Sequence, residues 1–185
     1  MPLPRTLRFG VCTFGKRGYS TRVGPLARRH FQNQNQTNIG PEGARGLADA
    51  LMSGRCTLQS LKLGLKNNIG VHGARSLADA LMSEHCMLRS LDLGIMNDIG
   101  ADGARGLAGA LTSEHCTLQS LKLGLKNNIG AGGARSIADA MISGHSRLQT
   151  LDLGHLNSIG EDGARSLVAA AQQAGCQVMP GLDAS

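Results

Sequence analysis

A thirty-residue repeat constrains the fold of this chain more than any other feature. Among the 185 residues, Gly-Ala-Arg recurs at 43–45, 73–75, 103–105, 133–135 and 163–165. The motif Leu-x-x-Leu-x-Leu-Gly keeps the same step, at 58–64, 88–94, 118–124 and 148–154. A sixty-residue period is superimposed, because residues 56–70 are identical to residues 116–130. A fixed period of this length predicts a stack of similar units in which each unit covers the next.

Each unit is predicted to be a short strand, a turn and a helix. Leu61 and Leu63 alternate with polar residues, which is the strand period. The turn follows at residues 67–70, and a helix is expected over about 71–82 because apolar residues there recur at helical spacing. Glycine at Gly73 usually weakens a helix by roughly 1 kcal/mol. We therefore expect the backbone of the neighbouring repeat to pack too closely there for a Cβ atom.

Stacking such units predicts a curved molecule. Identical units place their strands side by side in a parallel sheet with a step of about 4.8 Å. Helices are wider, roughly 10 Å across. The stack must therefore curve, with the strands on the inside.

The repeated residues resemble the leucine-rich repeat, specifically its ribonuclease-inhibitor-like subfamily. The resemblance covers about residues 38–174 and recurs in register four times. The period is slightly longer than is usual in the family, with an extra residue before Asn67 and another within 83–87. The matching positions of one repeat are Leu58, Leu61, Leu63, Asn67, Ile69, Gly70, Gly73, Ala74, Leu77, Ala78, Ala80 and Leu81.

This resemblance implies an α/β fold, a leucine-rich-repeat solenoid shaped as a short curved horseshoe with parallel strands on the concave side and helices on the convex side. It also implies an asparagine ladder that satisfies backbone groups left unpaired by the tight turn: Asn67, Asn97, Asn127 and Asn157. Members of the family include inhibitors, innate-immune receptors and activators of small GTPases, all of which hold another protein. The resemblance therefore implies protein binding and leaves the partner open.

Three segments are expected along the chain. The leucine-rich-repeat domain spans 38–175 with about four to five repeats, and a C-terminal tail spans 176–185. Residues 1–37 form a basic segment that carries seven Arg and Lys residues and no acid, whereas residues 38–185 carry twelve basic and thirteen acidic residues. Phe31 and Asn33 lie one period before Leu61 and Leu63 and are interpreted as a strand that has lost the leucine motif. At the other end, residues 175–180 are candidates to cover the last repeat.

Two interpretations of the basic segment stay open. It is a disordered tail, or residues 1–20 are a transit peptide in which 17–20 resemble a mitochondrial processing site. Five cysteines without a disulfide framework favour a reducing compartment. The expected location is therefore the cytoplasm, or the mitochondrion if the transit reading holds. No run of eighteen apolar residues occurs, so no membrane span is expected.

The candidate binding site is the concave strand face. Its central positions alternate in charge along the stack, and neighbours about 4.8 Å apart can pair. The face lacks aromatic anchors, so an inert solvated surface is the alternative, and the strand exits at Leu65, Ile95 and Leu125 would contribute to any binding. The candidate partner-binding residues are Ser60, Lys62, Ser90, Asp92, Ser120, Lys122, Thr150, Asp152 and His155.

Other chemistries are weakly supported. Asp92 and Asp152 lie two strand steps, about 10 Å, apart, with Lys122 between them, so no enzyme activity is expected. The His-Cys pairs at 85–86 and 115–116 are spaced too widely for a zinc site, so Cys56, Cys86 and Cys116 are expected in the core and no metal or cofactor is expected. Nucleic acid is not expected as a partner, because the repeats carry no aromatic residue for base stacking.

A row of arginines at 45, 75, 105, 135 and 165 is expected on the helix side. Asp49, Asp79 and Asp139 follow four residues later and can pair with three of them. Gly109 and Ala169 leave Arg105 and Arg165 without that partner.

Two functional hypotheses follow. The first is a non-enzymatic scaffold that holds a protein partner through the concave face or the adjacent loops. The second is a structural module, or a fragment of a longer repeat protein, that self-associates through its open ends and has no specific ligand.

Overall fold

The computed structural model describes residues 7–8, 12–15, 18–21, 30–32 and 38–179. Near the N-terminus, three strands form an antiparallel sheet: β1 (Leu7–Arg8), β2 (Cys12–Gly15) and β3 (Gly18–Thr21). A second sheet has six parallel strands in sequence order: β4 (His30–Gln32), β5 (Ser60–Lys62), β6 (Ser90–Asp92), β7 (Ser120–Lys122), β8 (Thr150–Asp152) and β9 (Gln177–Val178). Five helices alternate with these strands: α1 (Gly40–Met52), α2 (Gly70–Leu81), α3 (Gly100–Leu111), α4 (Gly130–Met141) and α5 (Gly160–Ala174).

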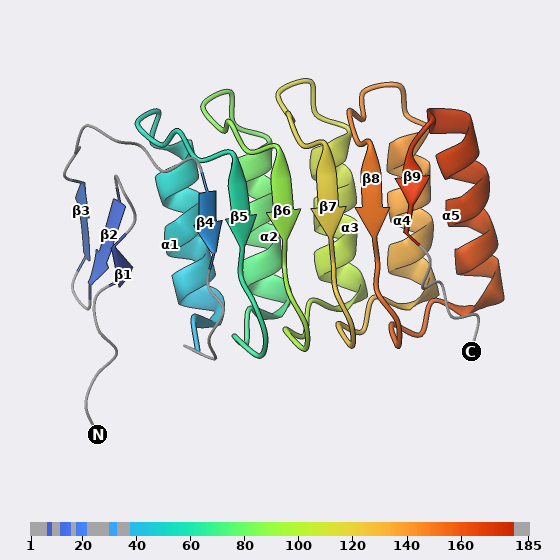
Figure 1. Ribbon diagram of the computed structural model, residues 1–185, viewed down its shortest axis with the longest axis horizontal. Coiled ribbons are helices and arrows are strands. Elements are labelled where there is room, and N and C mark those ends of the chain that lie inside the picture. Colours follow the sequence, from blue (N-terminus) through green and yellow to red (C-terminus); the bar gives the residue numbers. More distant parts are fainter. Residues whose placement is uncertain (1–6, 9–11, 16–17, 22–29, 33–37, 180–185) are drawn as a thin grey trace.

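The predicted α/β repeat architecture is confirmed. The helices form one layer that covers one face of the six-stranded sheet and leaves the other face open (Figure 1). Helices α1 and α5 lie outside the outermost strands β4 and β9 in this view, so the helix layer spreads more widely than the strand layer (Figure 1). The open strand face is therefore the inner side of the stack, as the different widths of strands and helices require.

The strand register follows the thirty-residue period. Leu61 pairs with Leu91, which pairs with Leu121, which pairs with Leu151. All four side chains are fully buried between the sheet and the helices. Burial of one leucine contributes roughly 1.5–3 kcal/mol, so the leucine column holds the strands in this register. A slip by one residue would turn every leucine toward water.

The close approach of one repeat's backbone to the next occurs at a different glycine from the one expected. A Cβ atom on Gly73 would lie 2.8 Å from the Cβ of Ala44 and 2.9 Å from a methyl of Ile69, while the nearest backbone atom of the previous repeat is 3.4 Å away. Side chains, rather than the predicted neighbouring backbone, therefore fill the space at Gly73. The close backbone approach occurs at Gly94, where a Cβ atom would lie 1.8 Å from the carbonyl oxygen of Gly64.

The sheet extends past the expected repeat boundaries, 38–175, at both ends. Strand β4 pairs with β5, with Phe31 opposite Leu61, so Phe31 does belong to a strand. Asn33 lies outside the described residues. At the other end β9 pairs with β8, and Cys176 is buried beneath it. Residues 176–179 therefore cover the last repeat, as the sequence suggested for residues 175–180.

The basic N-terminal segment is described only in part. Strands β1 to β4 fall within residues 1–37, and the other positions of the expected tail or transit peptide lie outside the described residues. Within the described part of the chain, no helix is long and apolar enough to cross a membrane.

Three of the arginines on the helix surface have acidic partners other than the residue four positions later. Arg75 lies 3.7 Å from Asp102 of the next helix, and Arg105 binds the same carboxylate at 2.8 Å. Arg165 binds Glu161 at 2.7 Å. Arg105 and Arg165, which have no acid four residues later, are bound instead by acids in the first turn of their own helices. All these groups are exposed, so each pair stabilises the fold by about 0–1 kcal/mol.

Candidate functional site

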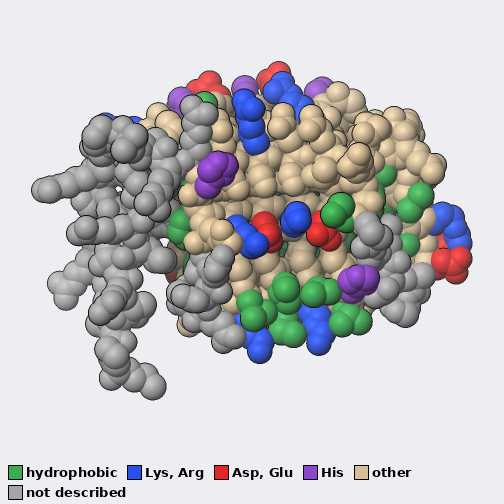
Figure 2. All heavy atoms as spheres, in the orientation of Figure 1, with side chains coloured by type: hydrophobic (Ala, Val, Ile, Leu, Met, Phe, Trp, Pro, Cys, Tyr) green, Lys and Arg blue, Asp and Glu red, His purple; other side chains and the backbone are tan. Residues whose placement is uncertain are grey.

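An alternating row of charges crosses the open strand face. The register places Lys62 beside Asp92, Asp92 beside Lys122, and Lys122 beside Asp152. Basic and acidic side chains alternate across the middle of this face, and hydrophobic side chains gather below them (Figure 2). The Nζ atom of Lys62 lies 3.7 Å from Asp92, and that of Lys122 lies 3.8 Å from Asp152. The row thus pairs within two-repeat units, which matches the sixty-residue period of the sequence.

Each carboxylate in this row is fixed by its own backbone. Oδ1 of Asp92 accepts a hydrogen bond of 2.9 Å from the N–H of Gly94, and Oδ1 of Asp152 accepts one of 2.9 Å from Gly154. The second oxygen of each group, Oδ2, faces the lysine. The aspartates are less exposed than the lysines, at 22% and 29% against 47% and 46%. The carboxylates are therefore positioned acceptors, whereas the lysine ends remain in solvent.

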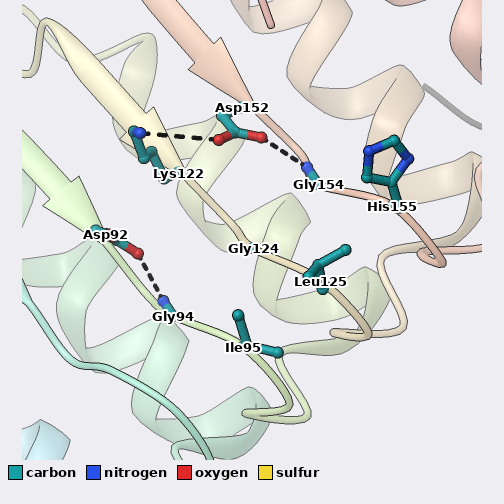
Figure 3. Close-up of a pocket in the computed structure, with 9 residues that line it drawn as sticks. All are labelled: Asp92, Gly94, Ile95, Lys122, Gly124, Leu125, Asp152, Gly154 and His155. Carbon is teal, nitrogen blue, oxygen red and sulfur yellow. Dashed lines mark hydrogen bonds and ion pairs between the residues drawn. The ribbon is translucent and has the colours of Figure 1, made fainter. Parts of the chain in front are cut away.

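A hollow of about 320 Å³ lies where three successive strands end. Its charged wall carries Asp92, Lys122 and Asp152, and its opposite wall carries Ile95, Leu125 and His155 (Figure 3). We call it the strand-exit hollow. Its lining residues are Asp92, Gly94, Ile95, Lys122, Gly124, Leu125, Asp152, Gly154 and His155.

Glycines form the floor of this hollow because no other residue fits there. Gly94, Gly124 and Gly154 have φ angles of +75°, +71° and +66°, in the left-handed region that side chains disfavour. A Cβ atom on Gly124 would lie 2.1 Å from the carbonyl oxygen of Gly94. The same close approach that packs the repeats together therefore leaves the floor without side chains.

The apolar wall is held by hydrogen bonds between successive turns. The N–H of Lys66 donates to the carbonyl of Ile95 at 2.9 Å, and the N–H of Met96 donates to that of Leu125 at 3.0 Å. The side chains of Ile95 and Leu125 are half-buried, and that of His155 is exposed. The strand exits thus present a fixed apolar edge beside the charged row.

The structure brings only part of the predicted site together. Asp92, Lys122, Asp152 and His155 line the strand-exit hollow. The serine and threonine residues that begin the strands are half-buried and do not line the hollow: Ser60, Ser90, Ser120 and Thr150. Lys62 lies one repeat earlier and reaches the site through its pair with Asp92. The role of the glycine floor was missed, although its recurrence directly after each strand was visible in the sequence.

A ladder of buried asparagines supports the turns behind this face. Oδ1 of Asn127 accepts from the N–H of Asn97 at 2.6 Å, and Oδ1 of Asn157 accepts from the N–H of Asn127 at 2.7 Å. The Nδ2 group of Asn127 donates to the carbonyls of Gly94 and Leu123. Asn127 and Asn157 therefore join neighbouring repeats and hold the carbonyls of the floor glycines Gly94 and Gly124.

The cysteines of the repeats belong to the core or pack against it. Cys86 and Cys116 are buried and Cys56 is half-buried, as expected for small apolar residues. Burial is the main cause that raises the pKa of the Cys86 and Cys116 thiols, so both are protonated near neutral pH. Within the described residues, no group of three or more His, Cys, Asp or Glu side chains is arranged to hold a metal ion.

Comparisons with known proteins find no family model and no curated protein that matches this chain. The functional argument therefore depends on the geometry of the open strand face.

Proposed function

We propose that this chain is a leucine-rich-repeat protein of the ribonuclease-inhibitor-like subfamily and acts as a non-enzymatic scaffold that holds a protein partner. The supporting observation is the strand-exit hollow, where fixed carboxylates and an apolar edge face each other across a floor without side chains. Such a surface offers complementary shape and charge to another protein.

Non-enzymatic binding also agrees with the chemistry of the face. Both aspartates that border the hollow are held by a lysine and a backbone N–H. A general acid or base must instead be free to exchange a proton with a substrate. The paired carboxylates suit recognition better than proton transfer.

A capture experiment tests this proposal. The full chain and a variant with Lys62, Asp92, Lys122 and Asp152 changed to Ala would be immobilised and exposed to native lysate. We expect a protein that the parent retains and the variant loses. The matched control changes Arg75 and Arg105 to Ala on the helix side and should retain the partner. Equal capture by the parent and the fourfold variant, with both folded, would refute binding through this face.

A second candidate function is self-association through the end of the stack. At equivalent helix positions Ala78, Ala108 and Ala138 are 2–4% exposed, whereas Val168 of α5 is 43% exposed. Met179, next to β9, is also 45% exposed. An apolar residue at an uncovered repeat face favours contact with another chain. Sedimentation analysis of the parent and of Val168→Glu would reveal a change in oligomer size if this end is an interface, and the fourfold variant should show none.

A further inference from the structure

We propose that the strand-exit hollow binds an arginine side chain presented by the partner protein. This inference rests on the proposed function and specifies its partner. The hollow has a volume of about 320 Å³, at the lower end of the range of roughly 300–1,000 Å³ for ligand pockets. It suits one long side chain better than a whole small molecule.

The charge of the lining favours a cation. Two carboxylates, Asp92 and Asp152, line the hollow together with one ammonium, that of Lys122, and the imidazole of His155. Lys62, which balances Asp92, does not line the hollow. An acidic side chain placed here would approach two carboxylates, whereas a cation would approach two acceptors that are already oriented by backbone hydrogen bonds.

Backbone hydrogen bonding leaves recognition to side chains. The carbonyls of Gly94 and Gly124 accept hydrogen bonds of 2.7 Å from Asn127 and Asn157. The N–H groups of Gly94 and Gly154 donate to the aspartates. Since these backbone groups are already hydrogen-bonded within the protein, a partner strand would gain little by adding to them. The acceptors for which a partner can compete are the carboxylates, whose Oδ2 atoms face half-exposed lysines.

Arginine matches both walls at once. Its aliphatic stem can lie on Ile95 and Leu125, which are half-buried and face the hollow (Figure 3). Its planar guanidinium carries five donors and binds carboxylates in bidentate fashion. The lysines already beside Asp92 and Asp152 form exposed pairs, at 3.7 and 3.8 Å. Such pairs are weak and exchange readily for a better-matched donor.

Peptide titration tests the inference. Capped pentapeptides Ala-Gly-X-Gly-Ala, with Arg, Lys, Glu or Leu at X, would be added to the full chain labelled with ¹⁵N. The amide resonances of Gly94, Gly124 and Gly154 report binding. We expect the Arg peptide to bind at least about fivefold more tightly than the Glu and Leu peptides and more tightly than the Lys peptide, because only Arg offers bidentate hydrogen bonds.

Variants locate the binding. D92N/D152N keeps an oxygen for the glycine N–H groups but loses both charges, and should weaken the Arg peptide about tenfold, as expected for charge-assisted hydrogen bonds. Lys122→Met removes the competing ammonium and should tighten binding about threefold. Asp102→Asn, on the helix side, should leave it unchanged. If D92N/D152N fails to fold, Lys122→Met alone decides, and unchanged or weaker binding overturns the inference.

Several results contradict the inference. These are tighter binding of the Glu, Leu or Lys peptide, or equal binding of the Arg peptide by folded D92N/D152N. Loss of lysate capture in the fourfold alanine variant, together with no preference for the Arg peptide, would overturn only this inference and leave the scaffold function standing. Preference for the Arg peptide without any captured protein would refute the scaffold function instead.

Discussion

The side-chain oxygen of Asn127 accepts a hydrogen bond of 2.6 Å from the backbone N–H of Asn97, thirty residues earlier in the chain. Through its Nδ2 group, Asn127 also holds the carbonyl of Gly94, on the floor of the strand-exit hollow. One buried amide therefore couples the stacking of the repeats to the shape of the binding face.

Replacing Asn127 with Ala should destabilise the fold by about 3 kcal/mol or more, because buried backbone groups left without partners cost roughly 1–3 kcal/mol each. Asn127 is fully buried, whereas the adjacent Asn128 is exposed. Asn128→Gly is the matched control, since glycine tolerates the φ of +56° at that position. Urea unfolding measures both variants, and similar losses in the two would contradict a special role for the buried ladder.

Gly124→Ala should prevent folding or reduce the free energy of unfolding by at least about 3 kcal/mol, because overpacking and left-handed strain act together. The added Cβ would lie 2.1 Å from the carbonyl oxygen of Gly94. Gly109, inside helix α3, has no atom within 4 Å of such a Cβ. Gly109→Ala should instead stabilise the chain by roughly 0.5–1 kcal/mol. Thermal unfolding distinguishes the two, and a tolerated Gly124→Ala would show that the turn can relax.

Leu156→Asn should stabilise the protein by up to about 1 kcal/mol, because asparagine accepts the left-handed region more readily than leucine. Leu156 has a φ of +58° and is 55% exposed, so little apolar burial is lost. Met87→Asn is the control, at a residue that is 49% exposed and outside the left-handed region. Chemical unfolding of both variants should show a higher free energy of unfolding for Leu156→Asn alone. A loss at Leu156 would mean that its side chain contributes packing that outweighs the backbone strain.

Stability should fall in alkaline solution through the buried thiols. Burial raises the pKa of Cys86 and Cys116 above the ordinary value of 9.0. As the pH rises, a thiol whose pKa is raised in the folded state ionises at a lower pH in the unfolded chain than in the folded protein. Its stabilising effect is therefore present below about pH 9 and is lost as the pH rises toward the raised pKa.

The double variant Cys86→Ala/Cys116→Ala tests this pH dependence. It should show a shallower decline in unfolding temperature above pH 9 than the parent. Its stability at neutral pH serves as the baseline, because the substitutions also remove packing. Parallel declines in the two proteins would assign the alkaline loss to other groups.

Much of the architecture could be predicted from periodicity. The step of thirty residues placed Leu61 beside Leu91 and Lys62 beside Asp92, and the structure has both pairs in register. Strands β4 and β9 were harder to predict, because their residues carry only traces of the leucine motif. They form because an exposed sheet edge leaves backbone groups unpaired, and the adjoining segment can satisfy them.

The candidate site was only partly predictable. The charged row was visible as alternating residues, but its pairing into Lys62–Asp92 and Lys122–Asp152 was not. It was also not predicted that Asp102 lies within reach of both Arg75 and Arg105, across two helices. The free energies of alternative surface ion pairs differ by only fractions of a kcal/mol. Spacing in the sequence therefore does not say which acid an arginine will pair with, and the side-chain geometry of the folded protein decides it.

Resemblance to the leucine-rich repeat implied the buried asparagine column. The sequence by itself determined the repeat, the alternation of strand and helix, the buried leucine column and the inward curvature. These follow from hydrophobic periodicity and from the widths of the elements, which are local properties. Only the tertiary structure decided that Gly94 and Gly124 approach the previous backbone, and that a hollow therefore opens between Asp152 and Leu125. That outcome depends on the distances between residues that are thirty positions apart in the sequence. Those distances are set by how the repeats pack.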